Sequence, residues 1–488
     1  MAKTISIDPI TRLEGHGKIT IFLNDDGSVK DCYFQIPELR GFERFVVGRP
    51  IEELPRIVTR ICGVCPASHH MAGAKAVDGC FGGELPPTAY KLRDMYYHAH
   101  YIHSHIAHFY ALAAPDFVCG PTSDPAQRNV LGLVAKVGLE IGGKVIKSRA
   151  QAQRIQQILG GRFTHLVWCI PGGVAKGCKP EELDEIKPMV DELYDFTLLG
   201  IKLFKDLVLS NKEYVDLIVN GPYTLDVQNM GLVDENNAPN FYNGKVRVVD
   251  FEGKEICKYE PKDYMNYVAE HVEPWSYLKF PYLKQRGWNG FVEGINSSIY
   301  CATPLSRLNV ADRMATPKAQ EFYEEMYSTL GGKPVKAQMA QHWARLIEMV
   351  QNAEMLKKYV ADPEITSDKF RVIPSKITGE GVGIVEAMRG TLTHHYTCDQ
   401  NGICTSANLI VGTTNNNAPI HMMTKKVAST MIKPGIEPDQ GILNLVEMAF
   451  RAFDPCFSCA THSLPGQMPL EVKIVKNGEL YREFKRNC

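Results

Sequence analysis

Two Cys-x-x-Cys pairs lie near opposite ends of this 488-residue chain: Cys62 with Cys65, and Cys456 with Cys459. The spacing within each pair lets both sulfurs point toward one centre, and thiolates select soft or borderline metal ions. If both pairs bind the same metal centre, the fold must bring together two segments that are separated in the sequence by most of the chain. The sequence therefore predicts a four-thiolate metal site inside a large folded body.

Other interpretations of these cysteines are a structural zinc site and a chance set of buried thiols. Zinc sites of this kind usually place their two pairs about 15–20 residues apart. The wide separation in this chain favours an enzyme centre over such a structural ion. A thioredoxin-like redox pair is also disfavoured, because no βαβ pattern surrounds either pair.

The amino-acid composition bears on which partners this protein binds and in which compartment it is expected. Hydrophobic residues make up 44% of the chain and charged residues 22%, which is ordinary for a globular protein. The net charge of −1 provides no basic excess, so no nucleic-acid partner is predicted. The sequence shows no secretion signal and no apolar run of membrane-spanning length, so we expect a cytoplasmic protein without a membrane span. The 14 cysteines would then be kept reduced.

Local patterns predict more helix than strand. Two apolar runs around Asn24–Gly27 predict a β-hairpin over residues 17–36. Short or irregular strands are expected over residues 213–300 and 370–411. Helical patterns, the third of them with Ser123 as its expected cap, occupy residues 50–81, 87–114, 124–159, 180–207, 317–330, 336–360 and 441–453. The sum predicts an α+β, helix-dominated fold with a central bundle of long helices, peripheral β-hairpins and irregular β segments.

The segments around both cysteine pairs resemble a known family. Arg60-Ile-Cys-Gly-Val-Cys65 with His69, and Asp454-Pro-Cys-Phe-Ser-Cys459-Ala-Thr-His462, are similar to the two signatures of nickel–iron hydrogenase large subunits. Three further motifs follow in the order of that family: Arg12-Leu-Glu-Gly-His16, Arg40-Gly-Phe-Glu43 and Glu386-Ala-Met-Arg389. Within the family, the chain looks most like the cytoplasmic viologen-reducing (non-deazaflavin-reducing) type, which partners heterodisulfide reductase.

The resemblance implies reversible heterolytic cleavage of dihydrogen into protons and electrons. It makes Cys62 and Cys456 terminal nickel ligands, with Cys65 and Cys459 bridging to an iron that carries carbon monoxide and cyanide. The Cys456 sulfur is the expected first proton acceptor, with Arg389 as the alternative.

Other site residues follow from the same resemblance. Glu14 matches a proton-relay glutamate, a role that suits a carboxyl group whose pKa is raised by burial; a salt-bridged core glutamate is the alternative. Asp454 is expected near Arg389. A magnesium ion is implied at Glu43, His462 and the carbonyl group of Leu409.

The resemblance also suggests how the chain is processed and what it binds. Residues 1–462 would form the catalytic domain, and residues 463–488 a C-terminal extension that resembles a propeptide removed by a maturation endopeptidase; retention of the extension is the alternative. The other ten cysteines show no further Cys-x-x-Cys, so no iron–sulfur cluster is expected in this chain. Electrons would leave through a small iron–sulfur subunit, then through a further electron-transfer subunit to heterodisulfide reductase. A non-catalytic scaffold related to hydrogenases is the alternative, although such a relative has lost the cysteine ligands.

Two departures from the family pattern concern the surroundings of the site. Met388 stands where relatives often carry a proline, and His103-Ser104-His105 stands where many relatives carry an aspartate. One predicted helix also carries five histidines, namely His98, His100, His103, His105 and His108. We expect these to be core and interface histidines rather than a metal store, with His105 a candidate hydrogen-bond partner of a thiolate.

Overall fold

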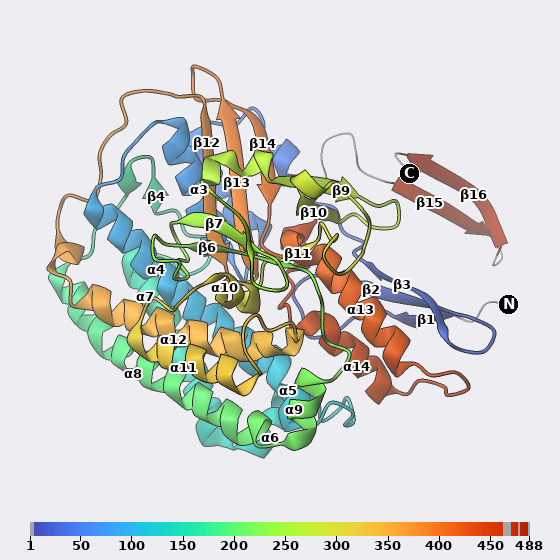
Figure 1. Cartoon of the computed structure of the whole chain (residues 1–488). Helices are drawn as coiled ribbons and strands as arrows, with labels where there is room; N and C mark the ends of the chain where they lie inside the picture. Colours follow the sequence, from blue (N-terminus) through green and yellow to red (C-terminus); the bar gives the residue numbers. More distant parts are fainter. Residues whose placement is uncertain (1–3, 462–469, 477–478, 487–488) are drawn as a thin grey trace.

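Long helices form the body of the molecule in the computed structural model, which describes residues 4–461, 470–476 and 479–486. Helices α4 (Pro87–Ile106), α7 (Leu139–Gly160), α8 (Pro180–Phe204) and α12 (Gln341–Val360) pack along one another, and α11 (Pro317–Thr329) lies against α12 (Figure 1). Helix α8 buries one stripe that includes Leu183, Ile186 and Val190, as an outer helix should. In α4 and α12 nearly all side chains are buried, so these two helices form the centre.

A three-stranded antiparallel sheet packs against a helix beside this bundle. Its strands are β12 (Glu380–Ala387), β13 (Gly390–Cys398) and β14 (Cys404–Ile410), and α3 (Pro66–Cys80) lies on it. The approach is close because glycines face each other: a Cβ atom on Gly79 would lie 2.8 Å from the Cα atom of Gly381. This contact brings the start of α3 close to the turn that ends β12.

The remaining strands form small separate sheets. Strands β1 (Thr4–Ile7), β2 (Lys18–Leu23) and β3 (Val29–Gln35) form one antiparallel sheet, and β6 (Gln228–Val233), β7 (Lys245–Val249), β8 (Glu255–Tyr259) and β11 (Tyr300–Cys301) form another. The two-stranded sheets are β4 (Cys169–Ile170) with β5 (Gly173–Val174), β9 (Val268–Val272) with β10 (Lys279–Leu283), and β15 (Leu470–Lys476) with β16 (Glu479–Arg486).

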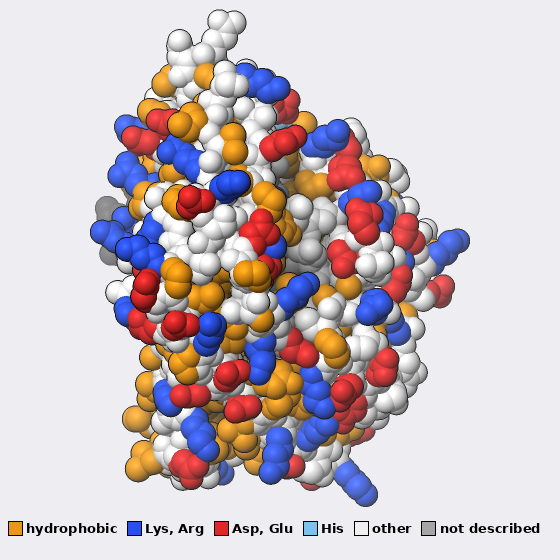
Figure 2. Space-filling view, turned by 90° about the vertical axis from the view of Figure 1, so that its left-hand side faces the viewer, with side chains coloured by type: hydrophobic (Ala, Val, Ile, Leu, Met, Phe, Trp, Pro, Cys, Tyr) orange, Lys and Arg blue, Asp and Glu red, His pale blue; other side chains and the backbone are white. Residues whose placement is uncertain are grey.

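Shorter helices connect these parts. They are α1 (Phe42–Phe45), α2 (Leu54–Ile57), α5 (Ala114–Val118), α6 (Val130–Val137), α9 (Lys212–Val219), α10 (Pro304–Val310), α13 (Asn417–Met431), α14 (Gln440–Arg451) and α15 (Phe457–Ala460). Among the described residues, no helix is long and apolar enough to cross a membrane. On the face seen in Figure 2, basic and acidic side chains are interspersed, so no patch of one charge dominates it.

The predicted α+β, helix-dominated class is confirmed, and so is the hairpin of β2 and β3. The single helix expected over residues 124–159 is wrong. Gly138, at φ 88° and ψ 157°, separates α6 from α7, and the side chain of Asn129, not Ser123, caps α6. Helices α9 and α13 were not predicted; most of α13 is buried, so its sequence lacks a clear polar face.

Candidate metal centre

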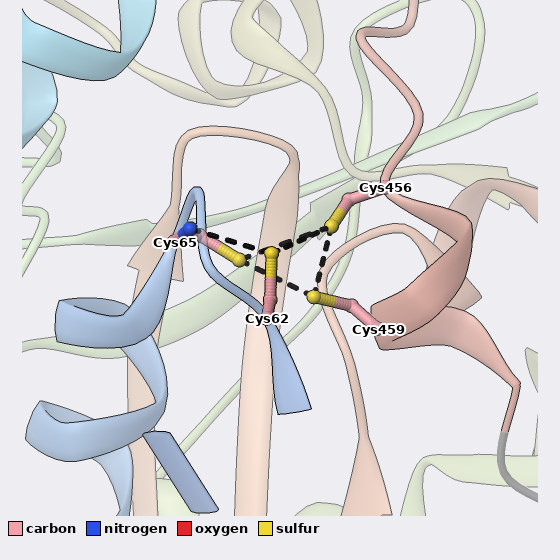
Figure 3. A group of neighbouring side chains, drawn as sticks. All are labelled: Cys62, Cys65, Cys456 and Cys459. Atoms are coloured by element: carbon pink, nitrogen blue, oxygen red, sulfur yellow. Dashed lines mark hydrogen bonds between the residues drawn. The ribbon is translucent and has the colours of Figure 1, made fainter. Parts of the chain in front are cut away.

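The four predicted cysteines come together in the structure. The Sγ atoms of Cys62 and Cys456 are 3.3 Å apart, those of Cys65 and Cys459 are 3.3 Å apart, and those of Cys456 and Cys459 are 2.9 Å apart (Figure 3). All four sulfurs lie within 4.8 Å of one another. Each cysteine is at most 5% exposed, so the cluster is closed to bulk water.

Backbone pairing explains how segments from both ends of the chain meet. Cys62 and Cys65 lie in the loop that enters α3, and Cys456 and Cys459 lie in the segment that follows α14. The N-terminal segment joins them, since the backbone N–H of Glu14 donates to the carbonyl of Pro455 and the N–H of Phe457 donates to the carbonyl of Glu14. The guanidinium of Arg40 donates to carbonyls on both sides, at Ile61 and Ser458.

The electrostatics of the cluster suit a cation. Burial raises the pKa of the Cys456 and Cys459 thiols well above their ordinary value, whereas hydrogen bonds from these two thiols lower that of Cys62. Four thiolates at such distances would repel one another in a medium of low dielectric constant. A soft cation removes this repulsion, and the donor set of four sulfurs fits nickel as well as zinc.

Glu14 lies directly against this cluster. The Cys456 Sγ donates to the Glu14 Oε2 at 2.9 Å, and the backbone N–H of Ser458 donates to the same oxygen at 3.2 Å. Burial, followed by the negative charge of Cys62, raises the pKa of the Glu14 carboxyl. This arrangement allows one proton to pass between a cluster sulfur and a carboxylate.

Arg389 reaches the cluster from the turn between β12 and β13. Its Nε atom forms an ion pair with Asp454 Oδ1 at 3.2 Å, and the Arg389 side chain is 4% exposed. Although burial alone would lower the pKa of Arg389, Asp454 and the cysteines raise it. Asp454 adopts φ 52°, a strained conformation for this residue type that its buried surroundings hold in place.

A small internal cavity adjoins three of the four cysteines. Cys65, Cys456 and Cys459 line it together with Arg389 and apolar residues that include Leu392 and Val411. Cys62 is not among its lining residues. The cavity therefore extends the cluster on the side of Cys65, Cys456 and Cys459, away from Cys62.

A much larger apolar cavity, of about 580 Å³, extends to residues beside the cluster, although none of the four cysteines lines it. It extends from α6 and α7 to Leu13, Glu14, Val64 and Arg389. Its walls are predominantly hydrophobic, so it suits a small apolar molecule better than an ion.

Two site contacts were not assigned in the sequence analysis. The His69 Nε2 lies 3.4 Å from the Cys459 Sγ, and its Nδ1 lies 3.2 Å from the Nε2 of His394. Burial lowers the pKa of His69 to about 4, so the imidazole is neutral. The hydroxyl of Thr413 accepts a hydrogen bond from the backbone N–H of Cys456. The position of His69 one helical turn after Cys65 was the available signal; Thr413 offered none.

Two of the three residues expected to bind magnesium, Glu43 and Leu409, lie together, with a lysine among them. The Glu43 Oε1 accepts hydrogen bonds from the Leu409 backbone N–H at 2.8 Å and the Lys279 Nζ at 3.0 Å. The Lys279 ammonium also donates to the Leu409 carbonyl at 3.3 Å and pairs with Glu270 at 2.8 Å. Glu43 Oε2 is buried without a hydrogen-bond partner among the described residues. His462 lies outside the described residues.

The histidines of the α4 region do not share a site. His98 contacts Asn352, His100 contacts Gln156, and His105 contacts Glu348 at 2.9 Å. The suggestion that His105 bonds a thiolate is therefore wrong, because α12 places a carboxylate in reach of its ring. Within the described residues, the four cysteines are the one group of three or more His, Cys, Asp or Glu side chains with metal-binding geometry.

Comparisons with known proteins agree across nearly the whole chain. Residues 40–126 and 144–462 match the family model described as nickel-dependent hydrogenase, and residues 4–39 match one described as HoxL-like. The chain is 47% identical to an F420-non-reducing hydrogenase iron-sulfur subunit of Archaeoglobus profundus, over 99% of both chains. It is 43% identical to a subunit of the F420-non-reducing hydrogenase of Methanothermobacter marburgensis, over 97% of this chain and 98% of that one.

Solved structures give the same result. A structure of the NAD⁺-reducing [NiFe]-hydrogenase in the H2-reduced state superposes with a TM-score of 0.89 and 36% identity, covering 94% of this chain and 99% of that one. The Ni-Fe-Se hydrogenase from D. vulgaris Hildenborough has the same fold, with a TM-score of 0.75, 24% identity, and coverage of 95% and 100%.

Proposed function

This chain belongs to the nickel-dependent hydrogenase family and is a catalytic subunit of a nickel–iron hydrogenase; we propose that it cleaves dihydrogen reversibly and heterolytically at the cluster of Cys62, Cys65, Cys456 and Cys459. When bound there, a nickel–iron centre with carbon monoxide and cyanide on the iron supplies the redox and Lewis-acid chemistry. The single observation that carries the proposal is the closed set of four sulfurs within 4.8 Å.

The shape of the cluster supports unequal roles for its four thiols. Cys62 and Cys456 would bind nickel alone, and Cys65 and Cys459 would bind both metals. The small cavity adjoins Cys65, Cys456 and Cys459 but not Cys62, so it offers space for diatomic ligands beside both thiols that would bridge. His69 supports this assignment, because its Nε2 can donate a hydrogen bond to the Cys459 sulfur and reduce its charge.

The proton would leave through Glu14. Cys456 Sγ holds the proton first and passes it to Glu14 Oε2, which already accepts its hydrogen bond. Arg389 is the alternative first acceptor. We favour Cys456, because the Asp454 carboxylate and the cluster sulfurs stabilise the protonated form of Arg389. The apolar cavity of about 580 Å³ would admit dihydrogen to the same corner of the site.

A magnesium ion fits the oxygen donors of Glu43 and Leu409. Glu43 Oε2, which is buried without a hydrogen-bond partner in the described part of the chain, would bind the ion beside the Lys279 ammonium. His462 would complete the site. Residues 463–488 would then be a propeptide that a maturation endopeptidase removes after residue 462.

We also propose that electrons leave through a small iron–sulfur subunit. The relatives that match most of the chain carry names of hydrogenase subunits. Those named F420-non-reducing suggest that this enzyme does not reduce F420. From the resemblance of the sequence motifs, we further propose that heterodisulfide reductase and another electron-transfer subunit are downstream partners, in the cytoplasm. Dihydrogen-dependent reduction of viologen without reduction of F420 would support this assignment, and rapid F420 reduction would reject it.

Elemental analysis and infrared spectroscopy of the purified enzyme test the proposed centre. We expect nickel and iron together with infrared bands of carbon monoxide and cyanide. Zinc alone, without such bands, would reject the assignment. An intact mass of active enzyme that includes residues 463–488 would reject the propeptide.

A further inference from the structure

The turn that carries Arg389 is short. Ala387 pairs with Gly390, so Met388 and Arg389 form a two-residue connection between β12 and β13. Such connections usually need a positive φ at a central residue, which glycine or asparagine supplies. Neither Met388 nor Arg389 has a positive φ, and the glycine with a positive φ, Gly390 at 140°, follows them. Contacts from outside the hairpin therefore help to hold Met388 and Arg389.

Those contacts are hydrogen bonds to four successive carbonyl groups. The carbonyl of Glu386 accepts from the hydroxyls of Tyr97 and Tyr101, at 2.6 and 2.9 Å. The next two carbonyls, of Ala387 and Met388, accept from the guanidinium of Arg307 at 3.1 and 3.2 Å. The carbonyl of Arg389 accepts from the side-chain amide of Asn416 at 2.9 Å.

Arg307 is itself held rigidly. It lies on α10 with no exposed surface, and Glu348 of α12 accepts two hydrogen bonds from it, at 2.6 and 2.9 Å. Its Nη1 also donates to Glu386 Oε2 at 3.1 Å. The second oxygen of Glu386 accepts from the hydroxyl of Thr391, at the far side of the same turn. Arg307 therefore links the helix bundle to both strands of the hairpin.

The side chain of Arg389 has few bonds of its own. Within the described part of the chain, Asp454 is the one residue that forms an ion pair with Arg389, and the Arg389 Nη1 has no hydrogen-bond partner. The place of its guanidinium beside the thiols therefore depends on the backbone that carries it.

We propose that Arg307 is a positioning residue for the hydrogenase reaction, which holds the Met388–Arg389 turn so that the Arg389 guanidinium faces the four-thiol cluster. The inference rests on the proposed role of Arg389 at the active site. Arg307 contacts none of the four cysteines and does not itself line the small cavity beside them, so it reaches the cluster through the turn it holds, which carries Arg389.

Arg307→Lys in the intact, metal-loaded enzyme tests this inference. Lysine keeps the positive charge but lacks the planar fork that reaches two carbonyls together. We expect kcat for dihydrogen-dependent viologen reduction to fall about 10- to 100-fold, as misplacement by about 1 Å can cause. Nickel content should stay unchanged, and the infrared bands of the iron-bound diatomic ligands should shift.

Arg93→Lys is the matched control. Arg93 is also fully buried, and it pairs with Asp78 at 2.6 Å and with the carbonyls of Ile170 and Gly173. It lies on α4, away from the Arg389 turn. We expect Arg93→Lys to lower the melting temperature about as much as Arg307→Lys does, without moving the infrared bands or lowering kcat to the same extent.

A double variant separates positioning from a general loss of stability. If Arg307 acts through Arg389, then Arg307→Lys should have little further effect on kcat in an Arg389→Lys background. If the fold-losses of kcat from the two substitutions multiply in the double variant, the inference is overturned. A folded Arg307→Lys enzyme with unchanged kcat and unchanged infrared bands would also overturn it. Full activity in Arg389→Lys alone would reject the proposed role of Arg389 and the inference with it.

If Arg307→Lys does not accumulate with nickel, Glu348→Gln replaces it. That change weakens the hold on Arg307 without replacing any residue that contacts the Arg389 turn directly. A loss of kcat smaller than that expected for Arg307→Lys, and absent when Arg389→Lys is also present, would support the inference. A fold-loss that multiplies with that of Arg389→Lys would overturn it.

Discussion

The Sγ atom of Cys456 donates a hydrogen bond to Oε2 of Glu14 at 2.9 Å, across 442 positions of sequence. The pairing depends on the backbone bonds that lay the N-terminal segment on the C-terminal cysteine pair. It gives the cluster a carboxylate that is partly buried and has a raised pKa.

Glu14→Gln should remove the proton acceptor while keeping the shape and most hydrogen bonds of the side chain. We expect dihydrogen oxidation to fall by a factor of about 10² to 10⁴, the usual contribution of a general base. Nickel content should not change. Full activity would show that Glu14 is a core glutamate, and loss of nickel would show that it holds the cluster together.

Cys456→Ser should abolish dihydrogen-dependent viologen reduction, because a hydroxyl is a poor ligand for the soft metal that thiolates select. Elemental analysis should show loss of nickel in parallel. Cys257→Ser is the control, since Cys257 is half-buried and lies outside the cluster. Retained activity in the Cys456→Ser enzyme would contradict the ligand assignment.

Gly15→Ala should loosen the contact between the two ends of the chain. Gly15 adopts φ 88°, and a Cβ atom there would lie 2.8 Å from the backbone nitrogen of Ser458. Gly48→Ala shares the strain, at φ 83°, but nothing lies within 4 Å of its Cβ position. We expect thermal unfolding to show a modestly lower melting temperature for both variants. Elemental analysis should show a lower nickel content only for Gly15→Ala. Equal nickel content would mean that the segment tolerates the shift.

Lys279→Met should destabilise the protein by about 3–5 kcal/mol, because it leaves the buried carboxylates of Glu43 and Glu270 without their ammonium partner. Magnesium should raise the melting temperature of this variant more than that of the wild type. Lys75→Met is the control, since the ammonium of Lys75 binds the carbonyls of Tyr242 and Ile384 instead. An identical response to magnesium in the two variants would argue against a magnesium site at Glu43.

The buried imidazole of His70 should make stability depend on pH. Its Nε2 accepts from the backbone N–H of Cys169 and its Nδ1 lies 2.8 Å from the Pro55 carbonyl, so the ring is neutral, and burial lowers its pKa to about 4. The unfolded chain binds this proton below about pH 6.5 and the folded chain does not, so stability falls as pH drops from 6.5 toward 4. One such group contributes about 1.4 kcal/mol per pH unit. Urea titrations of His70→Gln should show a shallower dependence by that amount, with exposed His16→Gln as the control.

The sequence predicted the elements with strong local signals. Buried and more exposed residues alternate along β2 and β3, with a turn sequence between the two strands. Helix α8 has one apolar stripe, and this is the side that it buries. The division between α6 and α7 was missed although its cause is local: Gly138 adopts φ 88°, and among the described residues no atom beyond its chain neighbours lies within 4 Å of its Cβ position. Helix α13 was missed because most of its residues are buried, so its polar face is narrow.

By itself, the sequence determined which donor atoms this protein offers: four thiols in two pairs, a carboxylate in an Arg-x-Glu-Gly-His motif, and an arginine before Gly390. Only the tertiary structure decided how they act together. In the folded chain, Glu14 accepts a hydrogen bond from Cys456, and His105 forms one with Glu348. The Lys279 ammonium donates to Glu43, and Arg307 donates to the backbone of the turn that carries Arg389. The reason is physical: a residue type carries its chemistry with it, whereas a contact between distant residues exists only once the core has packed around them.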